Sequence, residues 1–316
     1  MYDDLVEFLQ ESVTPFHAAA TAESWLRAAG FTRLEEADYW NLEPGKGYYT
    51  TRNGSSVVAW RVPDHAIGGW RIVASHSDSP TWKIKTDIVE NDGCRRLSVE
   101  GYGGMIMSTW LDRPLTVGGR VIVKTEDGIE SRLVCIDRDL LVIPSLAIHF
   151  QRDINKGHTF NPQVDMQPLW GPAGSRTLTD LVAEELGVDT ADILDSDLQL
   201  VTRQAPTQIG PDGEFFMAPR IDDLECAATT LLGFLDAAAE TDSACAPVWA
   251  MLDNEEVGSS SRMGAQSSYL RDVLDRIVDS IPHSGQAMHR AMANSFMLSA
   301  DTVSYTHLTL PTNSLV

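Results

Sequence analysis

Three short apolar segments of the chain end in acidic or imidazole side chains. The first covers residues 248–252 and is followed by four polar residues, 253–256. The second, at 69–75, is followed by His76 and Asp78, and the third, at 295–300, is followed by Asp301. Short apolar runs bounded by polar residues are typical of buried strands. Because ligand sites of open α/β sheets lie beyond the carboxyl ends of their strands, we expect these side chains to converge.

The polar residues after the first segment include two adjacent carboxylates, Glu255 and Glu256. Neighbouring carboxylates repel each other and raise each other's pKa unless a cation lies between them or one keeps a proton. An isolated Glu-Glu pair is more often a solvated acidic loop. The side chains at two other strand ends favour a metal site instead.

A further acidic pair, Asp222 and Asp223, precedes the apolar helical pattern of residues 224–235. Acidic residues at this position can cap a helix and complement its dipole. That interpretation fits Asp223 better, whereas we expect Asp222 to be a metal ligand. One imidazole with several carboxylates suits zinc, with cobalt or manganese as alternatives. A carboxylate bridging two such ions about 3.5–4 Å apart would make a hydrolytic centre.

Elsewhere the hydrophobic pattern predicts a mixed α/β fold. Helices are expected at residues 3–10, 17–29, 177–186, 224–239 and 263–281. Asn53-Gly54 predicts a hairpin between two strands. His17 is interpreted as a helix-start residue, and the glycine-rich segment 101–104 as tight turns.

Short alternating strands fill most of the region from residue 85 to 217, which predicts an inserted β-rich domain between His76 and Asp222.

Four motifs resemble those of the aspartyl aminopeptidase family of zinc metallopeptidases. They lie at residues 75–80, 220–223, 253–259 and 299–301, and the segments 14–18, 108–116 and 146–155 also match, so that the resemblance covers nearly all of residues 1–302. It implies a mixed-sheet zinc-peptidase domain with helices on both faces, made of residues 1–84 and 218–302. A β-rich dimerisation domain, residues 85–217, would interrupt it.

The resemblance also implies a ligand set for two zinc ions. His76 and Asp301 would hold one ion, Asp222 would bridge, and Glu256 would hold the second. Glu255 would be the general base.

Two further roles follow from the same resemblance. Asp78 would orient His76 through its other ring nitrogen, as residues around metal ligands commonly do. His149 matches a histidine that reaches into the active site of a neighbouring subunit. From the residues alone, the segment 146–150 is more typical of a core strand that contains a satisfied histidine.

The implied reaction is hydrolysis of the first peptide bond of a peptide, preferably after Asp or Glu. The sequence itself identifies no basic contact for an acidic substrate. Another amide hydrolase, such as a carboxypeptidase or deacylase, could use the same site. A non-catalytic assembly protein could hold structural metal there, but it would have no use for Glu255.

Composition narrows the range of partners. With 24 Lys and Arg against 45 Asp and Glu, the net charge of −21 argues against nucleic acid and anionic membranes. No apolar run approaches the roughly 18 residues of a membrane span. Four cysteines without a C-x-x-C pair, and an acidic amphipathic N-terminus, favour a cytoplasmic protein with reduced thiols. The resemblance also implies that the partners are peptide substrates and further copies of this chain, in a homo-oligomer built from dimers.

The last segment, residues 303–316, resembles a translated transposase-type sequencing adapter rather than the family's continuation. We therefore expect it to be non-native, His307 included. The family's last metal-ligand histidine would lie further along, and we expect the chain as given to be inactive.

Overall fold

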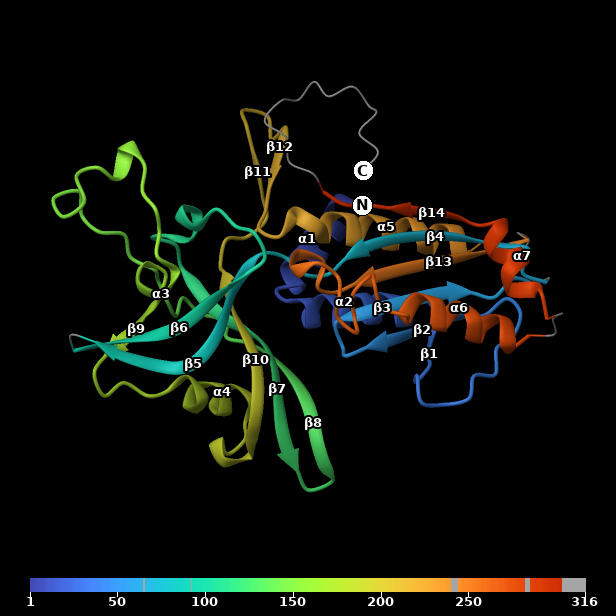
Figure 1. Cartoon of the computed structure of the whole chain (residues 1–316), viewed down its shortest axis with the longest axis horizontal. Helices are drawn as coiled ribbons and strands as arrows, with labels where there is room; N and C mark the ends of the chain where they lie inside the picture. The colour runs from blue at the N-terminus through green and yellow to red at the C-terminus, as the bar shows by residue number, and fades with distance from the viewer. Residues whose placement is uncertain (65, 92, 240–243, 282–284, 303–316) are drawn as a thin grey trace.

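Two six-stranded sheets lie side by side, the first with a hydrophobic core on each face and the second with one core (Figure 1). The computed structural model describes residues 1–64, 66–91, 93–239, 244–281 and 285–302. The predicted non-native tail, 303–316, lies outside the described residues. No helix in the described ranges is long and apolar enough to cross a membrane.

The first sheet has the strand order β1-β2-β3-β13-β4-β14. Its strands are β1 (Thr32–Arg33), β2 (Gly47–Arg52), β3 (Ser56–Arg61), β4 (Gly69–His76), β13 (Cys245–Leu252) and β14 (Phe296–Ser299). Both β13 and β14 run parallel to β4, whereas β3 runs antiparallel to β13. The three apolar segments are therefore strands of one mixed sheet, and their carboxyl ends meet at one edge, as predicted.

Helices cover both faces of this sheet. One face carries α1 (Tyr2–Glu11), α2 (Pro15–Ala28) and α5 (Ile221–Ala238), and the other carries α6 (Tyr269–Asp279) and α7 (Ala287–Ala293). On β13, the side chains of Trp249 and Met251 pack into the core beneath α1, α2 and α5, whereas those of Val248 and Ala250 pack into the core beneath α6 and α7. Burial on both faces explains why β13 is apolar throughout instead of alternating. The predicted fold class is confirmed.

The second sheet is antiparallel and has the order β8-β7-β10-β5-β6-β9. Its strands are β5 (Thr81–Asn91), β6 (Cys94–Tyr102), β7 (Leu115–Thr125), β8 (Gly128–Cys135), β9 (Leu169–Pro172) and β10 (Ile193–Thr202). The other elements of this region are α3 (Pro162–Asp165), α4 (Leu178–Leu186), β11 (Thr207–Ile209) and β12 (Phe215–Met217). The chain enters the second sheet directly after β4 and returns to the first sheet through α5. The domain boundaries at residues 84 and 217 stay a prediction.

Local signals in the sequence locate several element ends correctly. Asn53 and Gly54 both have positive φ and join β2 to β3 as a hairpin. Helix α4 begins with a capping box at Thr177 and ends at the left-handed Gly187.

One predicted helix starts at the wrong residue, and one predicted strand is absent from the described segment. The helix expected from Met263 begins only at Tyr269, because the chain folds back at Gly264: a Cβ there would lie 2.3 Å from the Ser259 carbonyl oxygen. The core strand expected around His149 is instead an exposed turn, in which the Phe150 side chain is 83% exposed. Apolar residues in this segment do not enter the sheet's core.

His17 is a helix-start residue, as predicted. Thr14 caps α2, Pro15 follows it, and the Thr14 hydroxyl accepts from the His17 backbone N–H. The His17 ring lies 2.8 Å from the same hydroxyl, Nδ1 to Oγ1. Burial and the positive charge of Arg220 lower the pKa of His17 to about 4.

The lowered pKa of His17 predicts a loss of stability in acid. A histidine whose folded pKa lies below its unfolded value stabilises the fold above about pH 6.5, and this contribution is lost as the pH falls towards 4. The fall in thermal midpoint between pH 7 and pH 4.5 should therefore be smaller for His17→Gln than for the unsubstituted chain. The same substitution at His289, an exposed residue of α7, is the matched control, and equal effects of the two variants would contradict the assignment.

Candidate metal site

Three of the predicted metal ligands converge at the carboxyl edge of the first sheet. His76 ends β4, Asp222 lies at the start of α5, and Asp301 follows β14. The His76 Nε2 atom is 3.3 Å from a carboxylate oxygen of Asp222 and 3.7 Å from one of Asp301. Together with Asp223, these residues offer ligand atoms that all lie within 4.8 Å of one another. An imidazole with three carboxylates is a donor set that zinc accepts.

Asp223 is not the helix cap that the sequence favoured. Its side chain is fully buried and accepts hydrogen bonds from the backbone N–H groups of His76, at 2.9 Å, and Thr302, at 3.1 Å. Helix α5 has no side-chain cap, and the backbone at Asp222 and Asp223 is not helical. The carboxylate of Asp223 therefore joins the end of β4 to the residues that follow β14, because both backbone donors need an acceptor there.

Asp78 organises the opposite side of His76. It is fully buried, and its carboxylate lies 3.4 Å from His76 Nδ1. It also accepts from the Tyr102 hydroxyl, at 2.7 Å, and from the backbone N–H groups of Glu255 and Glu256, each at 3.1 Å. Burial alone would raise the pKa of Asp78, but the hydrogen bonds from His76 and Tyr102 lower it below its usual range. Asp78 therefore holds both the imidazole and the turn that carries the two glutamates.

The two glutamates lie in a 3₁₀ turn, Glu255–Val257, directly after β13. Glu255 is exposed and Glu256 is partly buried. Among the described residues, neither belongs to the four-ligand cluster. Burial, followed by the negative charge of nearby Asp222, nevertheless raises the pKa of Glu256 to about 7. Its role as a ligand stays a prediction.

Burial and neighbouring charges shift the pKa of several groups in and around the cluster. Burial opposes protonation of His76, but the hydrogen bond to Asp78 and the charge of Asp223 raise its pKa to about 9. Burial raises the pKa of both Asp223 and Asp253 to about 6. Burial and the charge of Asp301 also raise the pKa of Asp222, against the charge of His76. A cation among these groups would satisfy the negative charge that protons otherwise neutralise.

The sequence analysis missed two residues of this region, Tyr102 and Gly103. The segment 101–104, predicted to be tight turns, is instead the end of β6 up to Tyr102 followed by a bend at Gly103, and it lies against the site. Tyr102 contacts Asp78, and a Cβ at Gly103 would lie 3.0 Å from both the Cβ and a carboxylate oxygen of Glu256. No signal in a single sequence identifies this contact, because it depends on the register of β5 and β6.

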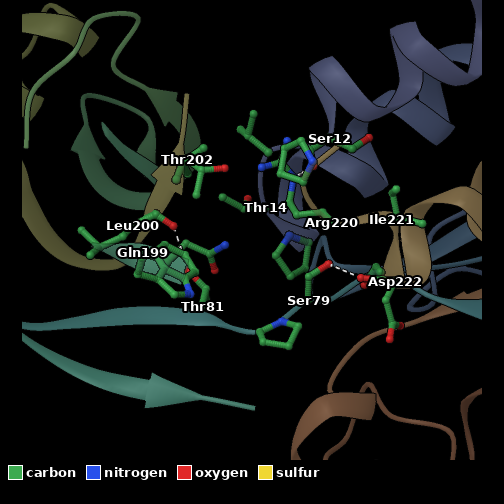
Figure 2. Close-up of a pocket in the computed structure, with 17 residues that line it drawn as sticks. Ser12, Thr14, Ser79, Thr81, Gln199, Leu200, Thr202, Arg220, Ile221 and Asp222 are labelled. Carbon is green, nitrogen blue, oxygen red and sulfur yellow. Dashed lines mark hydrogen bonds between the residues drawn. The ribbon is translucent and has the colours of Figure 1, made fainter. Parts of the chain in front are cut away.

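A pocket of about 210 Å³ lies beside the cluster, between the two sheets (Figure 2). Its lining includes Asp222, Arg220 and Ser79 near the first sheet, and Gln199 and Thr202 from β10. Figure 2 shows the Ser79 hydroxyl donating to the Asp222 carbonyl, at 2.8 Å. Of the four cluster residues, Asp222 alone lines this pocket. The pocket therefore borders the cluster without containing it.

Comparison with known families identifies the chain. The aminopeptidase I zinc metalloprotease family (M18) matches residues 8–313, which is nearly the whole sequence. This chain belongs to the M18 family of zinc aminopeptidases. The match extends into the segment 303–316, whose origin stays a prediction.

Two curated M18 relatives cover almost all of this chain. A probable M18 family aminopeptidase 2 from Clostridium novyi (strain NT) is 39% identical over 96% of this chain and 72% of its own length. One of the same name from Pseudomonas syringae pv. tomato is 37% identical over 96% and 71%, respectively. The chain thus spans somewhat less than three quarters of these relatives.

Solved M18 structures share the fold. Chaetomium thermophilum mApe1 has a TM-score of 0.88 and 32% identity, over 96% of this chain and 74% of its own. A structure of an Ape4 and Nbr1 complex contains a chain with a TM-score of 0.92 and 32% identity, over 96% of this chain and 64% of its own. The mApe1 dodecamer from S. cerevisiae has a TM-score of 0.84 and 26% identity, over 96% and 72%.

The role of Asp223 in this M18 chain can be tested with Asp223→Ala. We expect a loss of about 1–3 kcal/mol of stability for each buried N–H group that loses its acceptor, and weaker zinc binding because His76 and Asp301 lose their common support. Asp236→Ala, at an exposed position of α5, is the matched control. Chemical unfolding and zinc competition with a chelating dye would measure both effects. Similar behaviour of the two variants would contradict the role of Asp223 as a support for His76 and Asp301.

Proposed function

We propose that this chain carries the catalytic centre of a binuclear zinc aminopeptidase that removes an N-terminal residue, preferably Asp or Glu, from peptides. The observation that supports it most is the convergence of His76, Asp222 and Asp301 beside Glu255, which lies on a turn anchored by Asp78. The aminopeptidase names of its relatives favour this activity over a carboxypeptidase or deacylase. The acidic preference rests on the family resemblance alone.

Four side chains would hold the metal in this proposal. His76 and Asp301 would hold one zinc ion, Glu256 would hold the second, and Asp222 would be shared between them. When bound, zinc polarises the carbonyl of the scissile peptide bond. The contact of Asp78 with His76 Nδ1 would hold the ring proton on that nitrogen, which leaves Nε2 to face an ion. Cobalt or manganese could occupy the same donors.

Glu255 is the proposed general base. Its backbone N–H is fixed by Asp78, while its side chain is exposed. In this position it accepts a proton from the attacking water and returns it to the leaving amine. A site that held only structural metal would not need an additional carboxylate beside the ligands.

The experiment on Glu255 tests the proposed function directly. In a chain with the full length of the curated relatives, Glu255→Gln should keep its zinc content and lose roughly 10²–10⁴ in kcat, the range for a general base. Zinc would be measured by metal analysis, and hydrolysis with a panel of aminoacyl and N-acyl amides that includes aspartyl and glutamyl amides. Glu126→Gln, at an exposed position of the second sheet, controls for the lost charge. Loss of zinc from Glu255→Gln would make Glu255 a ligand instead.

We also propose that the protein is a cytoplasmic homo-oligomer built from dimers through the second sheet. One solved relative, the S. cerevisiae mApe1, is a dodecamer. In this chain, the segment 144–150 is exposed and apolar, with Leu146, Ile148 and Phe150 exposed around His149. An exposed cluster of apolar side chains favours a protein interface. His149 would then reach the active site of a neighbouring subunit.

Replacement of one apolar side chain in this segment tests the interface. Phe150→Asp should yield a smaller particle than the unsubstituted chain, because it places a charge in the apolar contact. Light scattering coupled to gel filtration would measure the mass. Tyr39→Asp changes an equally exposed aromatic residue beside the first sheet and should leave the mass unchanged. An unchanged mass of Phe150→Asp would place the interface elsewhere.

A further inference from the structure

Tyr102 connects the second sheet to the candidate metal site in the first. Thr81 and Tyr102 are paired in the β5–β6 register, so the end of β6 lies next to the point where the chain leaves β4. Figure 1 shows these ends of β5 and β6 at the junction of the two sheets. A residue of the second sheet is thereby placed within reach of the residues that surround His76.

We propose that Tyr102 is a positioning residue for the metal site, through which the second sheet sets the geometry of the zinc ligands. The inference rests on the proposed zinc site and adds a residue that acts on it indirectly. Tyr102 is not itself placed among the ligands or the reacting groups.

The hydroxyl of Tyr102 makes two hydrogen bonds with separate parts of the site. It donates to a carboxylate oxygen of Asp78, at 2.7 Å, and it accepts from the side-chain amide of Asn254, at 3.0 Å. Asp78 in turn contacts the His76 ring, while Asn254 directly precedes Glu255. One hydroxyl therefore fixes both the carboxylate that orients the imidazole and the residue that begins the glutamate turn.

Removal of this hydroxyl would affect groups that have little access to water. Asp78 is fully buried, and the same carboxylate oxygen that accepts from Tyr102 also accepts from the Glu256 backbone N–H. A buried carboxylate that loses a donor is costly and shifts towards its remaining partners. The shift would reach the His76 ring and both glutamates, because Asp78 contacts all three.

The neighbours of Tyr102 restrict its movement. The Lys83 ammonium lies 5.2 Å from the centre of the Tyr102 ring and is paired with Asp197, at 2.7 Å. Gly103 packs directly against Glu256, where a side chain would not fit without displacement. Tyr102, the last residue of β6, thus contacts Asp78, and Gly103, directly after it, contacts Glu256. The second sheet therefore helps to position the residues of the site.

Substitution of Tyr102 by Phe removes the hydroxyl and keeps the ring. In the 316-residue chain we expect zinc affinity, measured by competition with a chelating dye, to fall about 10–100-fold, the range for residues that support metal ligands. Tyr269→Phe is the matched control, because its buried hydroxyl donates to the Thr50 carbonyl at 2.8 Å on another side of the fold. It should lower the thermal midpoint without changing zinc affinity.

A second variant separates positioning from general destabilisation. Asn254→Gly removes the other partner of the Tyr102 hydroxyl, suits the positive φ of 66° at this residue, and should also weaken zinc binding. In the double variant with Tyr102→Phe the two losses should be less than additive, because they act through one hydroxyl. If Tyr102→Phe does not fold, weaker zinc binding by Asn254→Gly still supports the inference, and unchanged binding overturns it.

The results distinguish this inference from the proposed function. Equal zinc affinities of Tyr102→Phe and Tyr269→Phe, with tight binding by the unsubstituted chain, would overturn the role of Tyr102 and leave the metal site intact. Failure of the unsubstituted chain to bind zinc at all would overturn the metal site itself, and the role of Tyr102 with it.

Discussion

The buried carboxylate of Asp78 is the interaction on which the site depends. A buried charge is tolerated only when hydrogen bonds replace its lost water, and Asp78 takes them from His76, Tyr102 and two backbone N–H groups. These donors come from the end of β4, the turn after β13, and β6 of the other sheet. The requirement to satisfy one charge therefore brings three distant parts of the chain together.

Parts of this arrangement follow from local sequence. The apolar strands β4, β13 and β14 are recognisable because burial on both faces leaves few polar positions in them. Three strands that end at the same edge predict that His76, the two glutamates and Asp301 converge. The ligand atoms of His76 and Asp301 do lie together, with Asp222 from the start of α5, whereas among the described residues the glutamates lie outside this cluster. The Asn53-Gly54 hairpin and the caps of α4 are local as well, so they too could be predicted.

Other parts depend on partners that are remote in sequence. An aspartate before a helix is usually a cap, and only the position of the β4 and β14 backbones gives Asp223 a different role. Tyr102 reaches Asp78 because of strand register, which a glycine-rich turn does not reveal. The apolar residues around Phe150 predict a buried strand, but the sequence does not show whether other side chains cover them, and in the structure they are exposed.

The position of Asp301 after an edge strand has a consequence for how an ion would be held. Among the residues that the structure describes, β14 pairs only with β4, over four residues, and its side chains are exposed, whereas His76 is buried on a strand inside the sheet. Residues on an edge with few buried contacts open more readily than those of the core. A cation that joins Asp301 to His76 would also fasten β14 to the sheet. Metal occupancy and the local folding of this edge are therefore one linked equilibrium.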